Sequence, residues 1–136
     1  MEVLLIDDQP VIHELYPELL RKAFGDVTVT PATDLETAFQ RLAHHKPPDL
    51  ALLDLGLPGH SGLDTLRRFR WKFPSVPVVV ISSTEDSATV RVAQGMGVSG
   101  YVFKTATPDE TVSALKAIGA GGKFFPAGAL HEGPNK

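Results

Sequence analysis

Acidic, hydroxyl and ammonium side chains follow four short apolar runs in this 136-residue chain. Runs of this kind, rich in Val, Leu and Ile, are typical of strands buried on both faces of a parallel sheet. The carboxyl ends of such strands meet at one edge, where open α/β sheets bind their ligands. We therefore expect these side chains to converge there: Asp7, Asp8, Asp54, Ser82 and Lys104, which follow the runs 3–6, 50–53, 76–81 and 101–103.

Three carboxylates at one edge require a cation nearby. Two carboxylates about 4 Å apart repel each other by roughly 4 kcal/mol at an effective dielectric constant near 20. Lys104 offers one positive charge, and a divalent ion would offer two more. The chain has no Cys and no paired-histidine motif, which favours Mg²⁺ over zinc as the cofactor. Carboxylates, a hydroxyl, a lysine and Mg²⁺ suit phosphoryl transfer.

A nucleotide is not the expected phosphoryl donor. The sequence G-x-x-x-x-G-K-[ST] is absent, and the first apolar run continues into Asp7-Asp8-Gln9-Pro10 instead of a glycine-rich loop. For the hydroxyl group expected at this edge of the sheet, Ser83 is a second candidate, but the sequence spacing to Lys104 favours Ser82.

Segments with helical periodicity separate the apolar runs. The fifth has the clearest start, because Thr107-Pro108-Asp109-Glu110 is a capping box with proline at the first helical position. Trp71 is expected to pack on the flank of the third helix. Five strand-helix repeats predict a doubly wound α/β domain with a five-stranded parallel sheet and five helices. The expected strands are 3–6, 27–30, 50–53, 76–81 and 101–103. The expected helices are 10–24, one capped by Thr33 or Asp34 that reaches about His45, 61–73, 86–96 and one beginning at Pro108.

Length and composition indicate a single domain with a short tail. Residues 1–120 are expected to form the domain, and the glycine-rich residues 121–136 a linker or C-terminal tail in which part of Lys123-Phe124-Phe125 packs. The net charge of −3 argues against nucleic-acid contact by this domain. The apolar runs are too short for a membrane span, and no signal peptide is recognisable, so we expect a cytoplasmic protein without a membrane partner.

The same residues resemble a known family. The acidic pair Asp7-Asp8, Asp54 within the segment 52–59 (LLDLGLPG), Ser82, and Lys104 three residues after Tyr101 are similar to the receiver domain of bacterial two-component response regulators. This resemblance implies a flavodoxin-like, CheY-like sheet with strand order 2-1-3-4-5. Thr105 after the lysine, and the run 120–126, are similar to the NarL/LuxR-type subfamily.

The resemblance implies a role for each residue of the acidic edge. Asp54 would be the phosphoacceptor for a sensor histidine kinase. Asp8, Asp54 and the backbone carbonyl of Gly56 would bind Mg²⁺ directly, and Asp7 would act through water. Lys104 would pair with a phosphoryl oxygen.

Two further residues would form the switch. Ser82 would donate a hydrogen bond to the phosphoryl group and move toward it, and Tyr101 would turn inward into the space that opens. The protein would thus be a phosphorelay signalling domain that catalyses only its own aspartyl phosphorylation and dephosphorylation, and not an enzyme in the usual sense. Alternatively, Tyr101 is an ordinary half-buried aromatic residue whose hydroxyl reaches water.

The resemblance leaves three hypotheses open for the kind of protein to which this receiver domain belongs. The chain would be the N-terminal part of a NarL/LuxR-type transcription regulator that forms a homodimer and reaches DNA only through a missing C-terminal helix-turn-helix domain. It would otherwise be a free-standing receiver, or a degenerate receiver that works only as a binding module. A haloacid-dehalogenase-type phosphatase would need a second carboxylate two residues after Asp54, where Gly56 stands.

Overall fold

The computed structural model describes residues 1–57 and 61–126, in which strands and helices alternate along the chain. The strands pair in parallel in the order β2-β1-β3-β4-β5, which confirms the predicted topology. Pro58 and Gly59 of the quoted motif, and residues 127–136 of the expected tail, lie outside the described residues. The elements are β1 (Glu2–Ile6), α1 (Pro10–Phe24), β2 (Thr28–Ala32), α2 (Leu35–Leu42), β3 (Leu50–Asp54), α3 (Gly62–Lys72), β4 (Val78–Ser82), α4 (Ser87–Gly95), β5 (Gly100–Phe103) and α5 (Pro108–Gly119).

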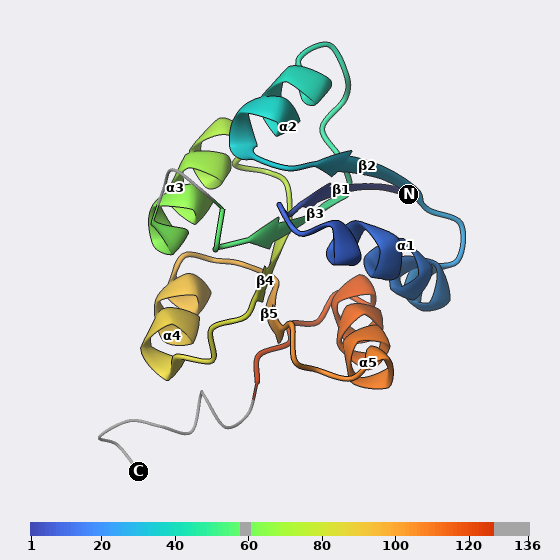
Figure 1. The fold of residues 1–136 in the computed structure, drawn as a ribbon, viewed down its shortest axis with the longest axis vertical. Coiled ribbons are helices and arrows are strands. Elements are labelled where there is room, and N and C mark those ends of the chain that lie inside the picture. Colours follow the sequence, from blue (N-terminus) through green and yellow to red (C-terminus); the bar gives the residue numbers. More distant parts are fainter. Residues whose placement is uncertain (58–60, 127–136) are drawn as a thin grey trace.

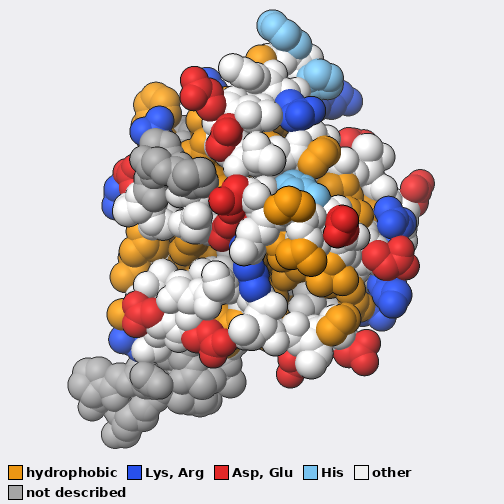
Figure 2. Space-filling view, in the orientation of Figure 1, with side chains coloured by type: hydrophobic (Ala, Val, Ile, Leu, Met, Phe, Trp, Pro, Cys, Tyr) orange, Lys and Arg blue, Asp and Glu red, His pale blue; other side chains and the backbone are white. Residues whose placement is uncertain are grey.

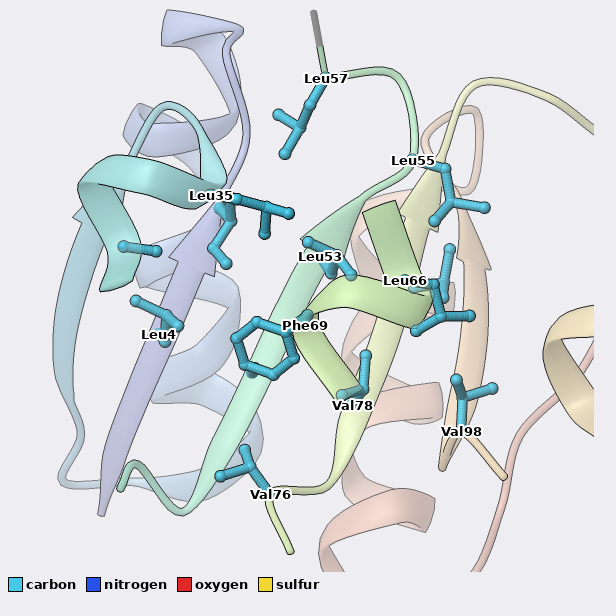
Figure 3. Close-up of a cluster of buried hydrophobic side chains, with 14 of the residues drawn as sticks. Leu4, Leu35, Leu53, Leu55, Leu57, Leu66, Phe69, Val76, Val78 and Val98 are labelled. Atoms are coloured by element: carbon cyan, nitrogen blue, oxygen red, sulfur yellow. The ribbon is translucent and has the colours of Figure 1, made fainter. Parts of the chain in front are cut away.

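The helices cover both faces of the sheet, α1 and α5 on one and α2, α3 and α4 on the other (Figure 1). Strands β3 and β4 are buried along their whole length because each lies between two strands and two helical layers. This explains why their sequences are continuously apolar instead of alternating. One core fills each side of the sheet, and Figure 3 shows the core under α2 and α3, where Phe69 and Leu66 face Leu4, Leu53 and Val78.

Most helix ends follow the expected local chemistry. The Thr107 hydroxyl accepts from the backbone N–H of Glu110, and the Glu110 carboxylate accepts in return from the backbone N–H of Thr107. This confirms the capping box. Gly25 ends α1 at a φ of 83°, a left-handed conformation that favours glycine. Among the described residues, none of the helices combines the length and the apolar character that a membrane crossing requires.

Three boundaries differ from the expectation by two or more residues. Helix α2 ends at Leu42 instead of about His45, because the chain tightens into a turn in which the backbone N–H of His45 donates to the Leu42 carbonyl. Strand β2 runs on to Ala32 through Pro31, which is tolerated because β2 lies at the edge of the sheet. Strand β4 begins at Val78, two residues later than expected.

The segment after α5 returns to the sheet. The Phe124 carbonyl accepts from the backbone N–H of Tyr101 at 2.9 Å, and the Phe124 N–H donates to the Ser99 carbonyl at 3.2 Å. A parallel bridge between Phe124 and Gly100 results. Phe124 packs on one core and Phe125 on the other, which confirms that part of this apolar run packs. The division at residue 120 stays a prediction.

Trp71 departs from its expected environment. Its side chain is 83% exposed, so the prediction that it packs on the flank of α3 is wrong. Phe69 and Phe73 supply the aromatic contacts between α3 and Phe39 of α2 instead, with ring centroids 5.3–6.4 Å apart.

Candidate functional site

The carboxyl ends of β1 and β3 bring three carboxylates together. Oxygen atoms of Asp7, Asp8 and Asp54 all lie within 4.8 Å of one another. Asp7 and Asp54 are buried, with 0% and 3% of their surface exposed, whereas Asp8 is exposed. The site therefore has a buried floor and one carboxylate open to solvent, an arrangement whose oxygen ligands could hold a metal ion.

Lys104 supplies the positive charge at this edge. Its ammonium lies 2.8 Å from Oδ2 of Asp7 and 3.3 Å from Oδ2 of Asp54. It also donates to Oε1 of Gln9 at 2.7 Å. Its side chain is only 9% exposed. The contact with Gln9 is a hydrogen bond, whereas Oδ2 of Asp7 accepts no hydrogen bond of good geometry within the described residues, so its contact with the ammonium is an ion pair.

The Asp54 carboxylate is held between opposing influences. Burial raises its pKa above the ordinary value, and the nearby Asp7 charge adds to that rise. The backbone N–H of Gly56, which donates to Oδ1 of Asp54 at 2.9 Å, and the Lys104 ammonium act in the other direction without cancelling it. An additional cation would favour the ionised form, which is the form that can act as a nucleophile.

Ser82 is the last residue of β4 and lies beside the end of β5, which Lys104 follows directly. Its carbonyl accepts from the backbone N–H of Lys104 at 2.8 Å, and its hydroxyl accepts from the backbone N–H of Thr84 at 3.1 Å. A hollow of about 400 Å³ is lined by Gly56, Ser82, Ser83 and Thr84, among others. Ser82 is 3% exposed while Ser83 is exposed, so the two hydroxyls have different surroundings.

Tyr101 is fully buried, with 0% of its surface exposed, so the alternative of a half-buried ring whose hydroxyl reaches water is wrong. Its hydroxyl makes no hydrogen bond of good geometry within the described part of the chain. Burial raises the pKa of the phenol, and the neighbouring Ser82 hydroxyl offsets part of the rise. The ring packs edge-on against Phe103, with centroids 5.8 Å apart. The side chain thus points inward, the orientation that the family resemblance implies for the switched form.

Three residues around the site were not singled out from the sequence. Gln9 contacts Lys104 with its side chain, and its backbone N–H donates to Oδ1 of Asp7 at 2.8 Å. Nε2 of His13 lies 2.6 Å from the Asp7 carbonyl oxygen. Tyr16 is buried close enough to Asp7 for that charge to help raise its pKa to about 12, although burial is the larger cause. All three lie in or just before α1, within ten residues of the acidic pair. This closeness in sequence is the feature that could have identified them as neighbours of the site.

Comparison with known proteins agrees with this arrangement. The profile described as "Response regulator receiver domain" matches residues 3–116. Nitrate/nitrite response regulator protein NarL of Escherichia coli strain K12 is 36% identical over 119 residues, which are 88% of this chain and 55% of NarL. The glycerol metabolism activator of Pseudomonas putida is 30% identical over 125 residues, 92% of this chain and 57% of that protein.

Solved structures show the same similarity. A LuxR-family two-component response regulator from Aurantimonas sp. SI85-9A1 has a TM-score of 0.81 at 30% identity, covering 96% of this chain and 93% of that chain. A LuxR-family DNA-binding response regulator from Silicibacter pomeroyi has a TM-score of 0.80 at 30% identity, covering 94% and 98%. The chain spans little more than half the length of the curated relatives it matches. The family profile covers most of the chain, and the acidic edge, the strand order and the homologues agree with it, so this chain belongs to the response regulator receiver domain family.

Proposed function

We propose that Asp54 accepts a phosphoryl group from the phosphohistidine of a sensor histidine kinase, or from a small phosphoryl donor. The surroundings of this carboxylate carry the assignment. Asp54 is almost fully buried, lies 3.3 Å from the Lys104 ammonium, and shares its edge of the sheet with two further carboxylates. A nucleophile next to a cation that can offset charge on the transferring group is what phosphoryl transfer requires.

The transfer step balances without a redox partner. An oxygen of the Asp54 carboxylate forms a bond to phosphorus while the P–N bond of the phosphohistidine breaks, and the electron pair stays on the imidazole nitrogen. Asp54 becomes an acyl phosphate. Lys104 pairs with one phosphoryl oxygen, and the Ser82 hydroxyl donates to another. The chain would later catalyse its own dephosphorylation, in which water takes the phosphoryl group and the carboxylate is restored.

Mg²⁺ fits the residues at this edge. Asp8, Asp54 and the Gly56 carbonyl would hold the ion directly, and Asp7 would act through water. The donors are all oxygens, and Asp8 is the exposed member of the carboxylate group, as suits an ion that keeps several waters. When bound, Mg²⁺ offsets negative charge on the phosphoryl oxygens.

We further propose that the whole protein is a NarL/LuxR-type transcription regulator in the cytoplasm, with this chain as its N-terminal part. The relatives that it matches extend well beyond the matched region, which makes up 55–58% of their length, and they are named as activators or response regulators. DNA would be contacted only by a C-terminal helix-turn-helix domain. A degenerate receiver is disfavoured, because all five residues of the acidic edge are present.

Exposed apolar surface on α1 supports a protein partner, either the kinase or a second copy of the chain. Val11 and Leu15, one helical turn apart, are 57% and 41% exposed. Figure 2 shows hydrophobic side chains gathered over α1 and beside α5. A hollow of about 600 Å³ on α5, lined in part by Phe103, Ala114 and Phe124, adds apolar surface at the far end of the sheet. Exposed apolar surface of this kind is typical of contact sites.

Intact-mass measurement after incubation with acetyl phosphate and Mg²⁺ tests the proposal. The wild-type chain should gain one phosphoryl group and Asp54→Asn none, while Asp26→Asn, at an exposed loop residue, should be labelled like the wild type. An unlabelled wild type under conditions that label a control receiver would favour the degenerate alternative. A labelled Asp54→Asn would show that the wrong residue was assigned. Beryllofluoride, a phosphoryl mimic, tests whether the face around Tyr101 changes and whether the chain dimerises.

A further inference from the structure

Gln9 occupies the N-cap position of α1, but its side chain does not cap the helix. Short side chains such as Ser, Thr, Asp and Asn serve best there, because they reach the free backbone N–H groups of the first turn. The Gln9 amide turns away from the helix, and its Oε1 accepts a hydrogen bond from Lys104 at 2.7 Å. The position thus forgoes a capping bond, and the side chain serves the site instead.

Gln9 holds both partners of the buried ion pair. Its backbone N–H donates to Oδ1 of Asp7 at 2.8 Å, while its side chain accepts from the ammonium that lies 2.8 Å from Oδ2 of the same carboxylate. A closed ring of contacts therefore links Gln9, Asp7 and Lys104. Because Gln9 contacts both Asp7 and Lys104, it restricts the position of the ammonium group at the end of the flexible lysine side chain.

The three contacts of Lys104 are unequal. Those to Gln9 and Asp7 are 2.7 and 2.8 Å, and the one to Asp54 is 3.3 Å. The longest contact is therefore the one to the proposed phosphoacceptor, and of the other two the contact to Gln9 is a hydrogen bond while the contact to Asp7 is an ion pair. Resting on the proposed function, we infer that Gln9 is a positioning residue: it fixes the Lys104 ammonium 3.3 Å from Oδ2 of Asp54, ready for a phosphoryl oxygen.

A neutral acceptor suits this task better than a charged one. An amide oxygen can hold the ammonium without adding a charge that would repel the incoming phosphoryl group. A carboxylate at position 9 would be a fourth negative group at this edge, beside Asp7, Asp8 and Asp54. It would attract Lys104 away from Asp54 and also repel the anionic donor.

Gln9 can be varied without endangering the fold. The residue is exposed, its backbone bond to Asp7 does not depend on the side chain, and no capping bond is lost. Gln9→Met keeps the length and removes the acceptor. Gln9→Glu keeps the length and the acceptor and adds a charge. Gln40→Met makes the first of these changes on the exposed surface of α2 and serves as the matched control.

The experiment measures phosphorylation by acetyl phosphate with Mg²⁺ as a function of donor concentration, and binding of beryllofluoride by ¹⁹F NMR. Gln9→Met should lower the maximal rate by about three- to tenfold with little change in the donor concentration at half-maximal rate, since the lost bond acts on the transferring group. Gln9→Glu should lower the rate further, and raised salt should restore part of its loss but none of the Met loss. Thermal midpoints should stay close to the wild type.

The outcomes separate this inference from the proposed function. If the wild type neither gains a phosphoryl group nor binds beryllofluoride, the proposed function itself fails. If the wild type does both, and Gln9→Met matches Gln40→Met in maximal rate and in beryllofluoride affinity, then Gln9 does not position Lys104. A Gln9→Met effect confined to the half-maximal donor concentration would equally overturn the inference, because it would indicate a role in donor binding alone.

Discussion

The ammonium of Lys104 lies 2.8 Å from Oδ2 of Asp7, closer than to the proposed phosphoacceptor. Asp7 has no exposed surface, so in the described structure the lysine compensates a fully buried charge. Lys104 therefore has a part in stability as well as in the proposed chemistry. Removing either member of such a pair leaves an uncompensated charge in a poorly solvated place.

Lys104→Met should be destabilising for this reason. We expect a loss of about 2–3 kcal/mol in the free energy of unfolding, somewhat below the usual cost for a deeply buried pair, because the lysine is close to solvent. Urea unfolding followed by circular dichroism measures it. Lys116→Met, at an exposed position of α5, should change stability by less than about 0.5 kcal/mol. Equal stabilities of the two variants would contradict the role of the ion pair.

Asp54→Asn should stabilise the metal-free protein at neutral pH. Because burial raises the pKa of Asp54 in the folded state, ionising this group opposes folding once the pH exceeds that raised value. The gain should grow as the pH rises through the raised pKa. It should shrink as the pH falls toward the ordinary value of 3.8, where the group is protonated in both states. Paired unfolding curves across this range test the sign, and a gain that grows in acid would contradict it.

Mg²⁺ should stabilise the wild-type protein through Asp8. An ion bound only to the folded state adds about 2.7 kcal/mol at a concentration of one hundred times its dissociation constant. Asp8→Asn should abolish most of this gain while leaving metal-free stability almost unchanged, since Asp8 is exposed. Thermal midpoints measured with Mg²⁺ and with a chelator give both quantities. An undiminished Mg²⁺ effect in the variant would place the ion elsewhere.

Tyr16 should make the protein sensitive to alkali. Burial and the Asp7 charge raise the pKa of its phenol from 10.0 to about 12. The unfolded chain therefore loses the proton first, and the stabilisation, full below pH 10, is lost as the pH rises through 12. Tyr16→Phe should remove about 2 kcal/mol of this loss. The pKa of Tyr101 is raised as well, so Tyr101→Phe is the companion variant, and phenolate absorbance shows which tyrosine titrates.

Gly100 lets the segment after α5 approach the sheet. A Cβ at this position would lie 2.6 Å from Cδ1 of Ile118 and 3.1 Å from the Phe124 carbonyl oxygen. Gly100→Ala should therefore displace Phe124 and cost about 1–3 kcal/mol. Hydrogen exchange of the Tyr101 N–H, which donates to that carbonyl, should accelerate.

Gly95→Ala is the matched control for this variant, because a Cβ there would meet nothing within 4 Å. It should leave the exchange of the Tyr101 N–H unchanged and stabilise α4 slightly. Unchanged exchange in Gly100→Ala would show that the contact with Phe124 is not tight.

The sheet and the acidic edge could be predicted because both depend on local patterns. Continuous apolar runs fix the strands, and the strand ends carry Asp7, Asp8, Asp54 and Lys104 to one edge in any parallel sheet of this order. The structure confirms the strand order, and it shows oxygens of the three carboxylates within 4.8 Å of one another and the lysine ammonium within 3.3 Å of two of these carboxylates, those of Asp7 and Asp54.

The features that could not be predicted depend on contacts between residues far apart in the sequence. The contact of Gln9 with Lys104 spans 95 residues of sequence, and a glutamine before a helix has no pattern that indicates its partner. The pairing of Phe124 with β5 depends on space that Gly100 leaves at the edge of the sheet. The environment of Trp71 was predicted wrongly because helical periodicity indicates the face of a helix on which a residue lies, but not whether a neighbouring helix extends far enough to cover that residue.

The exposure of Trp71 has a practical consequence for spectroscopy. It is the only tryptophan in the sequence, and at 83% exposure its indole is already hydrated in the native state. Intrinsic emission should shift little when the protein denatures. A small change in tryptophan emission on denaturation would thus reflect the exposed position of this one indole. It would give no measure of how well the chain is folded.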